Sequence, residues 1–460
     1  MLRLILSPSV GGTAGYLYDA VAALASSGGE AVLIVPEQYS FAAERIVLER
    51  LGTADAQRVE VLSFTRLANT VFNSVGWDKG KRLNEAGKIL LMSRALEQCA
   101  DKLTVYARSA DSPAVVRELL VLSEEFCQCA ISSEDIVSAM NNMEEGLLKD
   151  KLGDISLVFS VYDSFVSDGW LDDSRMLTRL KDKLAESGYF KNKTVFFDSF
   201  RGFTAQEFGI IGKILTQADD VCVALNAPDL TDVGSDDIFY HTKNTAKKLI
   251  KIANSVDVPC AKPVTVNEPN SDAALDALAK DFLSPEADVF EGECRSIAVV
   301  AAPDIRSECA FIAAQIKKML RTDEYRSRDI AVIVRDDKSY IRPMMTALAK
   351  CGVPVFEDRR QPVINQPLMT LVRAALKIAD TGFDTDSVLR ALKTGLCPLE
   401  ADEVSDIENY TYLWQINGSG WLKKWESSPD GFGEMTESAS AELERLNALR
   451  EKAVEPFARF

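Results

Sequence analysis

The segment LILSPSVGGTAGYLYDAV, from Leu4 to Val21, has the layout of a phosphate-binding loop: an apolar run, a turn of small residues and an amphipathic segment. Such a loop needs the pattern G-x-x-x-x-G-K-[ST], in which the lysine neutralises phosphate charge and the hydroxyl binds Mg²⁺. The register that suits the flanking elements puts Ser7 and Gly12 at the two glycines, Thr13 at the lysine and Ala14 at the hydroxyl. Three alternatives follow: a Gly-rich turn, a nucleotide site that has lost its chemistry, or a working site with an unusual loop.

An aspartate further along the chain bears on this choice. VFFDSF places Asp198 at the end of an apolar run, where P-loop ATPases hold Mg²⁺, and helicases follow that aspartate with a catalytic glutamate. Here the next residue is Ser199. An aspartate at a strand end is also a common turn or cap residue. Together with the altered loop, the serine favours a nucleotide site whose two halves have both decayed.

The elements that would position these residues alternate between short apolar runs and helical patterns. LRLIL, EAVLIVP, RVEVLSF, TVFFDSF and DVCVALNAP are predicted strands, and the helix after the first turn is predicted from about Tyr16. This alternation predicts an α/β fold with a parallel sheet. We expect a second α/β unit to begin at SIAVVAAP and to continue through the strand DIAVIVR.

Helical spacing without a strong strand separates the first three predicted strands from the last two. We therefore predict four regions: residues 1–80 with 190–290 as a first α/β domain, 81–189 as a helical insertion, 291–380 as part of a second α/β domain, and 381–460 as the start of a second helical insertion. The last pattern has no terminal cap, and the chain is expected to be a fragment.

The composition limits the classes of function. The net charge of −17 argues against a protein that coats DNA regardless of sequence, but it leaves room for a local basic channel. No apolar run is long enough for a membrane span, and the N-terminus does not resemble a secretory signal. The nine cysteines and the lone His241 lack metal-ligand spacing, so we expect reduced thiols, mostly in the core, a cytoplasmic location and no bound metal.

Eight segments in order resemble the AddB/RexB-type subunit of bacterial ATP-dependent helicase–nuclease complexes, and the likeness extends over nearly the whole chain. They are LIVPEQYSF, VLSFTRLANTVF, LNEAGKILLMSRAL, FFDSFRGFTAQEF, DIAVIVRDDKSY, GVPVFEDRR, PLMTLVRAALKI, and LKTGL followed by ENY. The resemblance implies P-loop NTPase, RecA-like domains of the UvrD-like superfamily 1 type, each with a helical insertion. It also implies a heterodimer with an AddA-type motor subunit, and DNA as the substrate, both single strands and duplex ends.

The resemblance also bears on cofactors. Family members carry a nuclease domain and an iron–sulfur cluster in a C-terminal region, and none of the nine cysteines matches the cluster arrangement. Many members keep the phosphate-loop lysine, from which this chain departs at Thr13 and Ala14. We therefore expect no cluster, no ATP·Mg²⁺ binding and no activity from this chain alone.

By motif position, the family's strand-contacting residues fall on Gln38, Ser40, Phe64, Arg66 and Phe203. Aromatic rings can stack on bases, arginine can bind phosphate or guanine, and glutamine can contact a base edge. Phe64 and Phe203 could equally be core aromatic residues, and Arg66 a solvated residue at a helix start.

Arg335 is the last candidate site residue, and three functions are compatible with the sequence. Arg335 ends DIAVIVR at the place of a γ-phosphate-sensing arginine, and with the loop altered a structural ion pair is favoured for it. The leading function is a helicase-like, ATPase-inactive subunit that scans single-stranded DNA for a Chi-type sequence during double-strand-break resection. The alternatives are an active DNA-dependent motor with an atypical loop, and a partner-docking scaffold without DNA contact.

Overall fold

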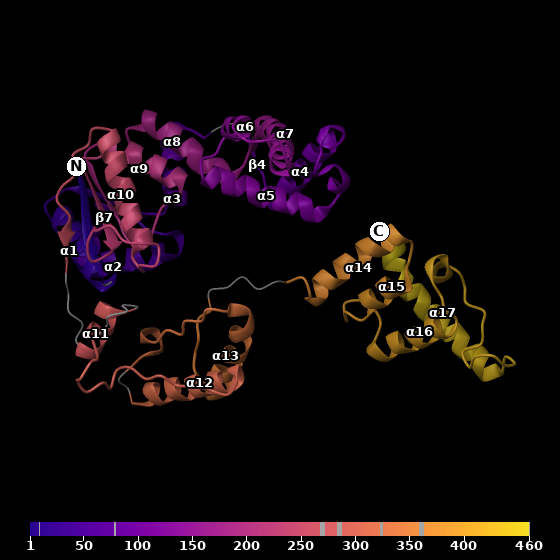
Figure 1. Ribbon diagram of the computed structural model, residues 1–460. Helices are drawn as coiled ribbons and strands as arrows, with labels where there is room; N and C mark the ends of the chain where they lie inside the picture. Colours follow the sequence, from indigo (N-terminus) through magenta and orange to yellow (C-terminus); the bar gives the residue numbers. More distant parts are fainter. Residues whose placement is uncertain are drawn as a thin grey trace. The chain divides into compact units, whose positions relative to one another are not determined.

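The structure is a computed structural model that describes residues 1–8, 10–77, 80–266, 272–282, 288–322, 325–357 and 363–459. The chain forms two compact units, Met1–Ala298 and Val299–Phe460, and each is described by itself (Figure 1). The end of the GVPVFEDRR segment, residues 358–360, lies outside the described residues.

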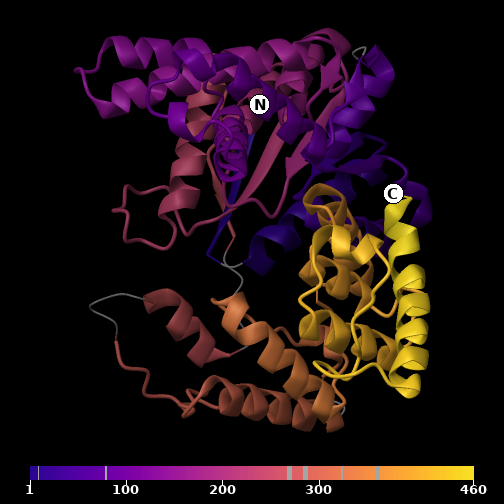
Figure 2. The same ribbon diagram turned by 90° about the vertical axis from the view of Figure 1, so that its right-hand side faces the viewer.

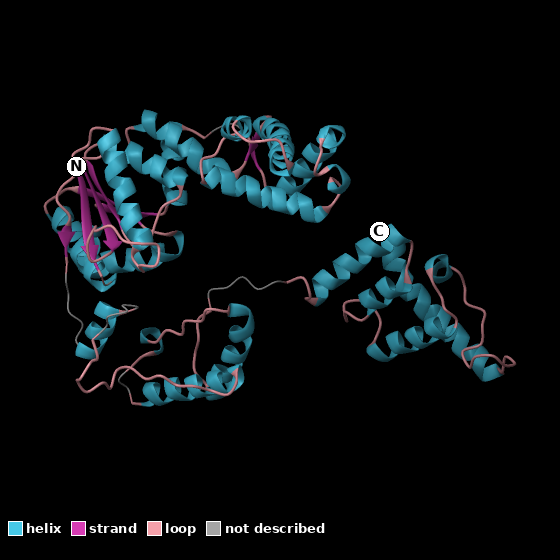
Figure 3. Ribbon diagram, viewed as in Figure 1, coloured by secondary structure: helices cyan, strands magenta, loops and turns pink. Residues whose placement is uncertain are grey.

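A six-stranded parallel sheet organises the first unit (Figures 2 and 3). Its order is β3 (Val59–Leu62), β2 (Glu30–Ile34), β6 (Lys193–Phe197), β7 (Asp220–Asn226), β1 (Leu2–Ser7) and β8 (Val264–Thr265). The five strands predicted from the N-terminal apolar runs are confirmed, and β8 is an additional two-residue edge strand. The fold is α/β and is compatible with a Rossmann-like or P-loop-like arrangement.

Helices cover both faces of the sheet. Because successive side chains of a strand point to opposite faces, Leu4 and Leu6 of β1 enter one core and Ile5 enters the other. The Ile5 face packs against α1 (Val10–Ser26) and α2 (Ser40–Ala56). The opposite face is covered by α3 (Phe64–Val75), α8 (Met176–Ser187), α9 (Ala205–Gln217) and α10 (Tyr240–Ser255).

A helical region interrupts the sheet between α3 and α8. It contains α4 (Glu85–Cys99), α5 (Pro113–Gln128), α6 (Ser133–Asn141) and α7 (Leu147–Ser167), with a two-residue parallel ladder between β4 (Lys81–Arg82) and β5 (Trp170–Leu171). These helices have their own hydrophobic core, which includes Met92, Leu119 and Phe159. The region folds around this core and leaves the sheet continuous.

Two buried charged groups hold this helical region together. Asp154 of α7 accepts hydrogen bonds from the backbone N–H groups of Thr104, Val105 and Tyr106, at 2.7 to 3.0 Å. Lys88 of α4 contacts Asp172 at 3.0 Å, and only 10% of the lysine side chain is exposed. Burial of a charge is tolerated when hydrogen-bond partners satisfy it, so these contacts tie separate segments together.

The second unit differs from the prediction. After α11 (Ala273–Asp281), which belongs to the first unit, its described residues form α12 (Ile305–Arg321), α13 (Asp337–Cys351), α14 (Pro367–Thr381), α15 (Thr385–Leu392), α16 (Ala401–Leu413) and α17 (Glu437–Ala458). SIAVVAAP and DIAVIVR were predicted to be strands, which is wrong for the described residues: Val299 is 95% and Ile333 94% exposed. A strand exists only where a neighbour pairs with its backbone, which an apolar pattern cannot guarantee.

Two further expectations can be compared with the described residues. The cysteines were expected mostly in the core, which is wrong: only Cys99, Cys222 and Cys309 are buried, and all nine are free thiols. Among the described helices, none combines the length and the apolar character that crossing a bilayer requires.

Candidate functional site at the carboxyl edge of the sheet

The residues selected from the sequence follow the carboxyl ends of neighbouring strands. Ligands of open parallel sheets bind in the crevice beyond these ends. Ser7 ends β1, Asp198 follows β6, and Asn226 ends β7. Since these strands are parallel neighbours in the order β6, β7, β1, their ends meet at one edge.

Helix α1 begins earlier than predicted. It starts at Val10 instead of near Tyr16, so Gly12, Thr13 and Ala14 lie in its first turns. Leu17, Tyr18 and Val21 of this helix are buried against the sheet, and this packing outweighs the low helix propensity of the glycines. Only residues 8 and 9 separate β1 from α1. The prediction of a turn reaching past Gly12 is therefore wrong.

Thr13 occupies the position of the phosphate-binding lysine. Its side chain is buried, and its hydroxyl donates to Oδ1 of Asn226 at 3.4 Å. The threonine thus links α1 to the end of β7. Neither it nor Ala14 supplies a positive charge, and Ala14 has no hydroxyl with which to bind a metal ion.

Asp198 occupies the position of the Mg²⁺-binding aspartate. Its backbone N–H donates to Ile34 O at 3.1 Å, and its side chain, 3% exposed, accepts from the Ser199 hydroxyl at 3.2 Å. Ser199 has a φ of 64°, a left-handed conformation that is uncommon outside glycine. Burial raises the pKa of Asp198 above its ordinary value, although the Ser199 hydrogen bonds oppose the shift.

Two tyrosines lie beside this aspartate. Tyr18 of α1 is buried, and Tyr39 lies in the short 3₁₀ helix η1 (Glu37–Tyr39) that follows β2. Burial and, next, the nearby Asp198 raise the pKa of both phenols. Two phenol rings therefore stand close to the carboxylate that a Mg²⁺ ion would need.

These residues do not fit a bound ATP·Mg²⁺. The positions of the lysine and the hydroxyl are held by Thr13 and Ala14, and the carboxylate is buried among aromatic rings. In addition, no group of three or more His, Cys, Asp or Glu side chains with metal-binding geometry occurs among the described residues. Thr13 and Asp198 instead make buried polar contacts with Asn226 and Ser199.

The five residues expected to contact a DNA strand are distributed along the same edge. Gln38 follows β2, Arg66 follows β3 and Phe203 follows β6, and these three strands are adjacent in the sheet. Gln38 and Arg66 are exposed, and Phe203 is half-buried. Ser40, the first residue of α2, is buried, so its side chain is not available at the surface. The sheet order thus brings Gln38, Arg66 and Phe203 to one edge.

Phe64 has a different environment. It is 6% exposed, and its ring lies 6.3 Å from Phe197 and 6.4 Å from Phe203 between centroids. Phe200 completes the group, 4.8 Å from Phe203. In this structure Phe64 is a core residue that packs against Phe203, whereas the half-buried Phe203 remains partly accessible.

Two arginines complete the predicted set. The backbone N–H of Arg66 donates to the Ser63 hydroxyl, the N-cap of α3, and its guanidinium pairs with Glu44 of α2 at 2.5 Å. This pair is exposed, so the arginine can exchange the carboxylate for a phosphate at little cost. Arg335 belongs to the second unit, is exposed, and has no ion-pair partner among the described residues.

Sequence reasoning missed Tyr18, Tyr39 and Asn226. Both tyrosines stand inside segments that contain predicted site residues, AGYLYDAV and PEQYSF. Tyr18 lies four residues after Ala14, which places both on one face of a helix. This spacing is visible in the sequence. It indicates a shared face only if Ala14 is helical, and the predicted start near Tyr16 left Ala14 outside the helix.

Comparison with known proteins gives a consistent result. Residues 4–279 match the family described as ADDB, N-terminal. Two relatives, each named as the B-type subunit of an ATP-dependent helicase/deoxyribonuclease, are 29% identical over 440 residues in Caldanaerobacter subterraneus subsp. tengcongensis and 30% identical over 434 residues in Clostridium novyi. Each alignment covers 93% of this chain and 38% of the relative, so the chain spans little more than a third of these proteins.

The match includes the predicted sheet and its carboxyl edge. It begins in β1 and extends past β8 into α11. The resemblance drawn from the eight segments is confirmed. Because the matched residues make up more than half of the chain, it belongs to the AddB N-terminal family.

Proposed function

We propose that the chain is the helicase-like N-terminal part of the AddB-type subunit of an ATP-dependent helicase/deoxyribonuclease. In this role it binds single-stranded DNA and scans it for a Chi-type sequence during double-strand-break resection in the cytoplasm. An AddA-type subunit is the motor with which it pairs. To the first unit we assign the RecA-like, UvrD-type fold of superfamily 1; the parallel sheet and the word helicase in the names of the relatives support this assignment.

One observation carries the DNA-binding role. Three adjacent strands, β3, β2 and β6, bring Arg66, Gln38 and Phe203 to one edge of the sheet. This set combines a cation for a phosphate, an amide for a base edge and a ring for stacking. Such a combination suits an unpaired strand, because stacking requires an exposed base face.

The proposal includes the loss of ATPase activity. Thr13 is hydrogen-bonded to Asn226, and Asp198 is buried beside Tyr18. Both contacts occupy positions at which a motor needs open phosphate and metal ligands. The competing function, an active motor, requires these side chains to rearrange before any nucleotide can bind.

Changing Arg66→Ala tests the DNA-binding role. We expect affinity for a fluorescein-labelled oligo(dT), measured by anisotropy at low salt, to fall about 3- to 10-fold, because a phosphate or base contact is removed. The matched control is Arg45→Ala, which removes an exposed arginine that pairs with Glu49 on α2. Absence of binding by the unaltered chain, or equal losses in the two variants, would contradict the proposal.

A further inference from the structure

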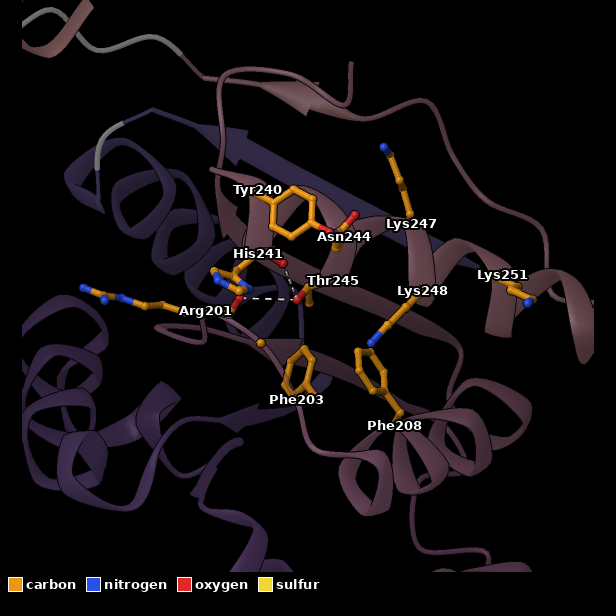
Figure 4. Close-up of a pocket in the computed structure, with 11 residues that line it drawn as sticks. Arg201, Phe203, Phe208, Tyr240, His241, Asn244, Thr245, Lys247, Lys248 and Lys251 are labelled. Carbon is orange, nitrogen blue, oxygen red and sulfur yellow. Dashed lines mark hydrogen bonds between the residues drawn. The ribbon is translucent and has the colours of Figure 1, made fainter. Parts of the chain in front are cut away.

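A groove of about 700 Å³ opens beside Phe203, on the α9 and α10 side of the sheet (Figure 4). The loop after β6 and one face of α10 form its walls, and Phe208 of α9 lies at its lower end. None of its lysines was selected from the sequence. The groove begins at the edge that holds Arg66, Gln38 and Phe203, because the loop after β6 forms one wall, and it runs from there along α10 from Tyr240 to Lys251.

The floor of the groove is fixed by one threonine. The Thr245 hydroxyl lies 2.9 Å from His241 O and 3.3 Å from Arg201 O, which ties the loop to α10 (Figure 4). A Cβ added to Gly202 would lie 3.3 Å from the same hydroxyl oxygen. The loop therefore approaches the helix closely, and the groove is held open before any ligand arrives.

Helix α10 is strongly basic on a strongly acidic chain. Its sixteen residues, YHTKNTAKKLIKIANS, include Lys243, Lys247, Lys248 and Lys251 and no carboxylate. Lys243 pairs with Asp229 and Lys247 with Asp232. The other two lysines are exposed, and among the described residues they have no carboxylate partner. Lys248 and Lys251 are three residues apart and share a face of the helix.

Aromatic rings alternate with these cations. The Lys248 ammonium lies 5.6 Å from the centre of the Phe208 ring, and Phe208 lies 5.6 Å from Phe203. Tyr240 stands at the other end of the groove, with Asn244 beside it (Figure 4). Phe203, Phe208 and Tyr240 are all half-buried, so each keeps part of its ring accessible.

We propose that this groove is a second contact site for single-stranded DNA, in which Lys248 and Lys251 bind successive phosphates and an unpaired base lies against Phe203 or Tyr240. Cations that follow the backbone and rings that accept bases are the two components of sequence-tolerant single-strand binding. The inference rests on the proposed function and adds a location for the strand beyond Phe203. Arg201 is not assigned a phosphate, because its guanidinium extends away from the two phenylalanine rings in Figure 4.

The double variant Lys248→Gln/Lys251→Gln tests this site in the full chain. We measure oligo(dT) binding by anisotropy from 25 to about 200 mM salt, and a titration with the mononucleotide dTMP runs in parallel. Each lost phosphate contact lowers the slope of log affinity against log salt by about 0.7 for single strands, so the double variant should lose about 1.4. Tyr240→Ala should weaken binding about 5-fold or more if the base stacks there.

Lys317→Gln/Lys318→Gln is the matched control, because it removes two exposed lysines from α12. We expect it to leave the salt slope unchanged. If the unaltered chain binds the strand and the α10 variant keeps its affinity and slope, this inference fails while the proposed function stands. If the unaltered chain binds no strand, the proposed function fails. If dTMP binds as tightly as oligo(dT), the groove is a mononucleotide site, and the assignment of successive phosphates is wrong.

Discussion

Thr13 and Asp198 occupy the two positions on which nucleotide binding at the carboxyl edge of the sheet depends. A motor needs a lysine and an open carboxylate at these positions. Here the first side chain bonds to Asn226, and the second is buried beside Tyr18 with a raised pKa. The substitutions at Thr13, Ala14 and Ser199 were visible in the sequence, whereas the tyrosine packing was not. This packing depends on which face of α1 meets the sheet, and a local sequence pattern does not predict which strand neighbours that face contacts.

A different ion pair gives a pH-dependent prediction at this scale. Lys243, with a side chain only 4% exposed, contacts Asp229 at 2.9 Å and links the loop after β7 to α10. The Thr231 hydroxyl and the Lys243 ammonium lower the pKa of Asp229 to about 2, from an ordinary 3.8. A lowered pKa in the folded state stabilises the fold above pH 3.8, and this contribution is lost as the pH falls towards 2.

We expect Asp229→Asn to reduce the free energy of unfolding by about 1 kcal/mol at pH 7, a modest cost because the aspartate is half-exposed. Between about pH 5 and pH 3 the difference from the unaltered chain should shrink. Denaturant unfolding of the two proteins, followed by circular dichroism at about pH 5 and about pH 3, measures this difference in unfolding free energy. Asp236→Asn, an exposed change in the same loop, is the control. An equal difference at the two pH values would show that charge is not the cause.

Among the secondary-structure elements, some sequence patterns predicted the observed strand or helix and others did not. The five strands could be predicted because each contains a mostly apolar run, and the central strands are buried on both faces, as is usual for parallel sheets. The start of α1 could not, since buried packing of Leu17 and Tyr18 extends the helix through Gly11 and Gly12. SIAVVAAP and DIAVIVR have strand-like patterns, but in the described residues they are unpaired and exposed.

The backbone contacts of Asp154 in helix α7 give a prediction about the stability of the helical region. Asp154 accepts four backbone contacts from residues 104–106, so Asp154→Ala leaves three part-buried N–H groups without their acceptor. Loss of charged hydrogen bonds of this kind costs about 2–3 kcal/mol. We expect that decrease in unfolding free energy, together with faster proteolysis near Leu103. Asp150→Ala, an exposed change in the first turn of α7, should cost less than about 1 kcal/mol. Similar costs in both variants would refute the role of Asp154.

For the molecule as a whole, the order of the strands shows where the proposed DNA contacts gather on a chain with a net charge of −17. Arg66, Gln38 and Phe203, which are far apart in sequence, follow the carboxyl ends of three adjacent parallel strands, and Lys248 and Lys251 lie on α10, which follows the fourth strand, β7. The predicted order of strands and helices made this edge foreseeable for Gln38, Arg66 and Phe203. It did not reveal the lysines of α10, because their approach to Phe203 depends on the contact of Thr245 with the loop after β6.

We propose that this edge keeps a DNA-binding surface after nucleotide chemistry has been lost. Calorimetric titration of ATP·Mg²⁺ into the 460-residue chain, at concentrations up to about 1 mM, tests it most directly. We expect only the heat of dilution, because Thr13 stands where the lysine is needed, Ala14 has no hydroxyl for the metal ion, and Asp198 is buried beside Tyr18. Saturable binding with a micromolar Kd would contradict it.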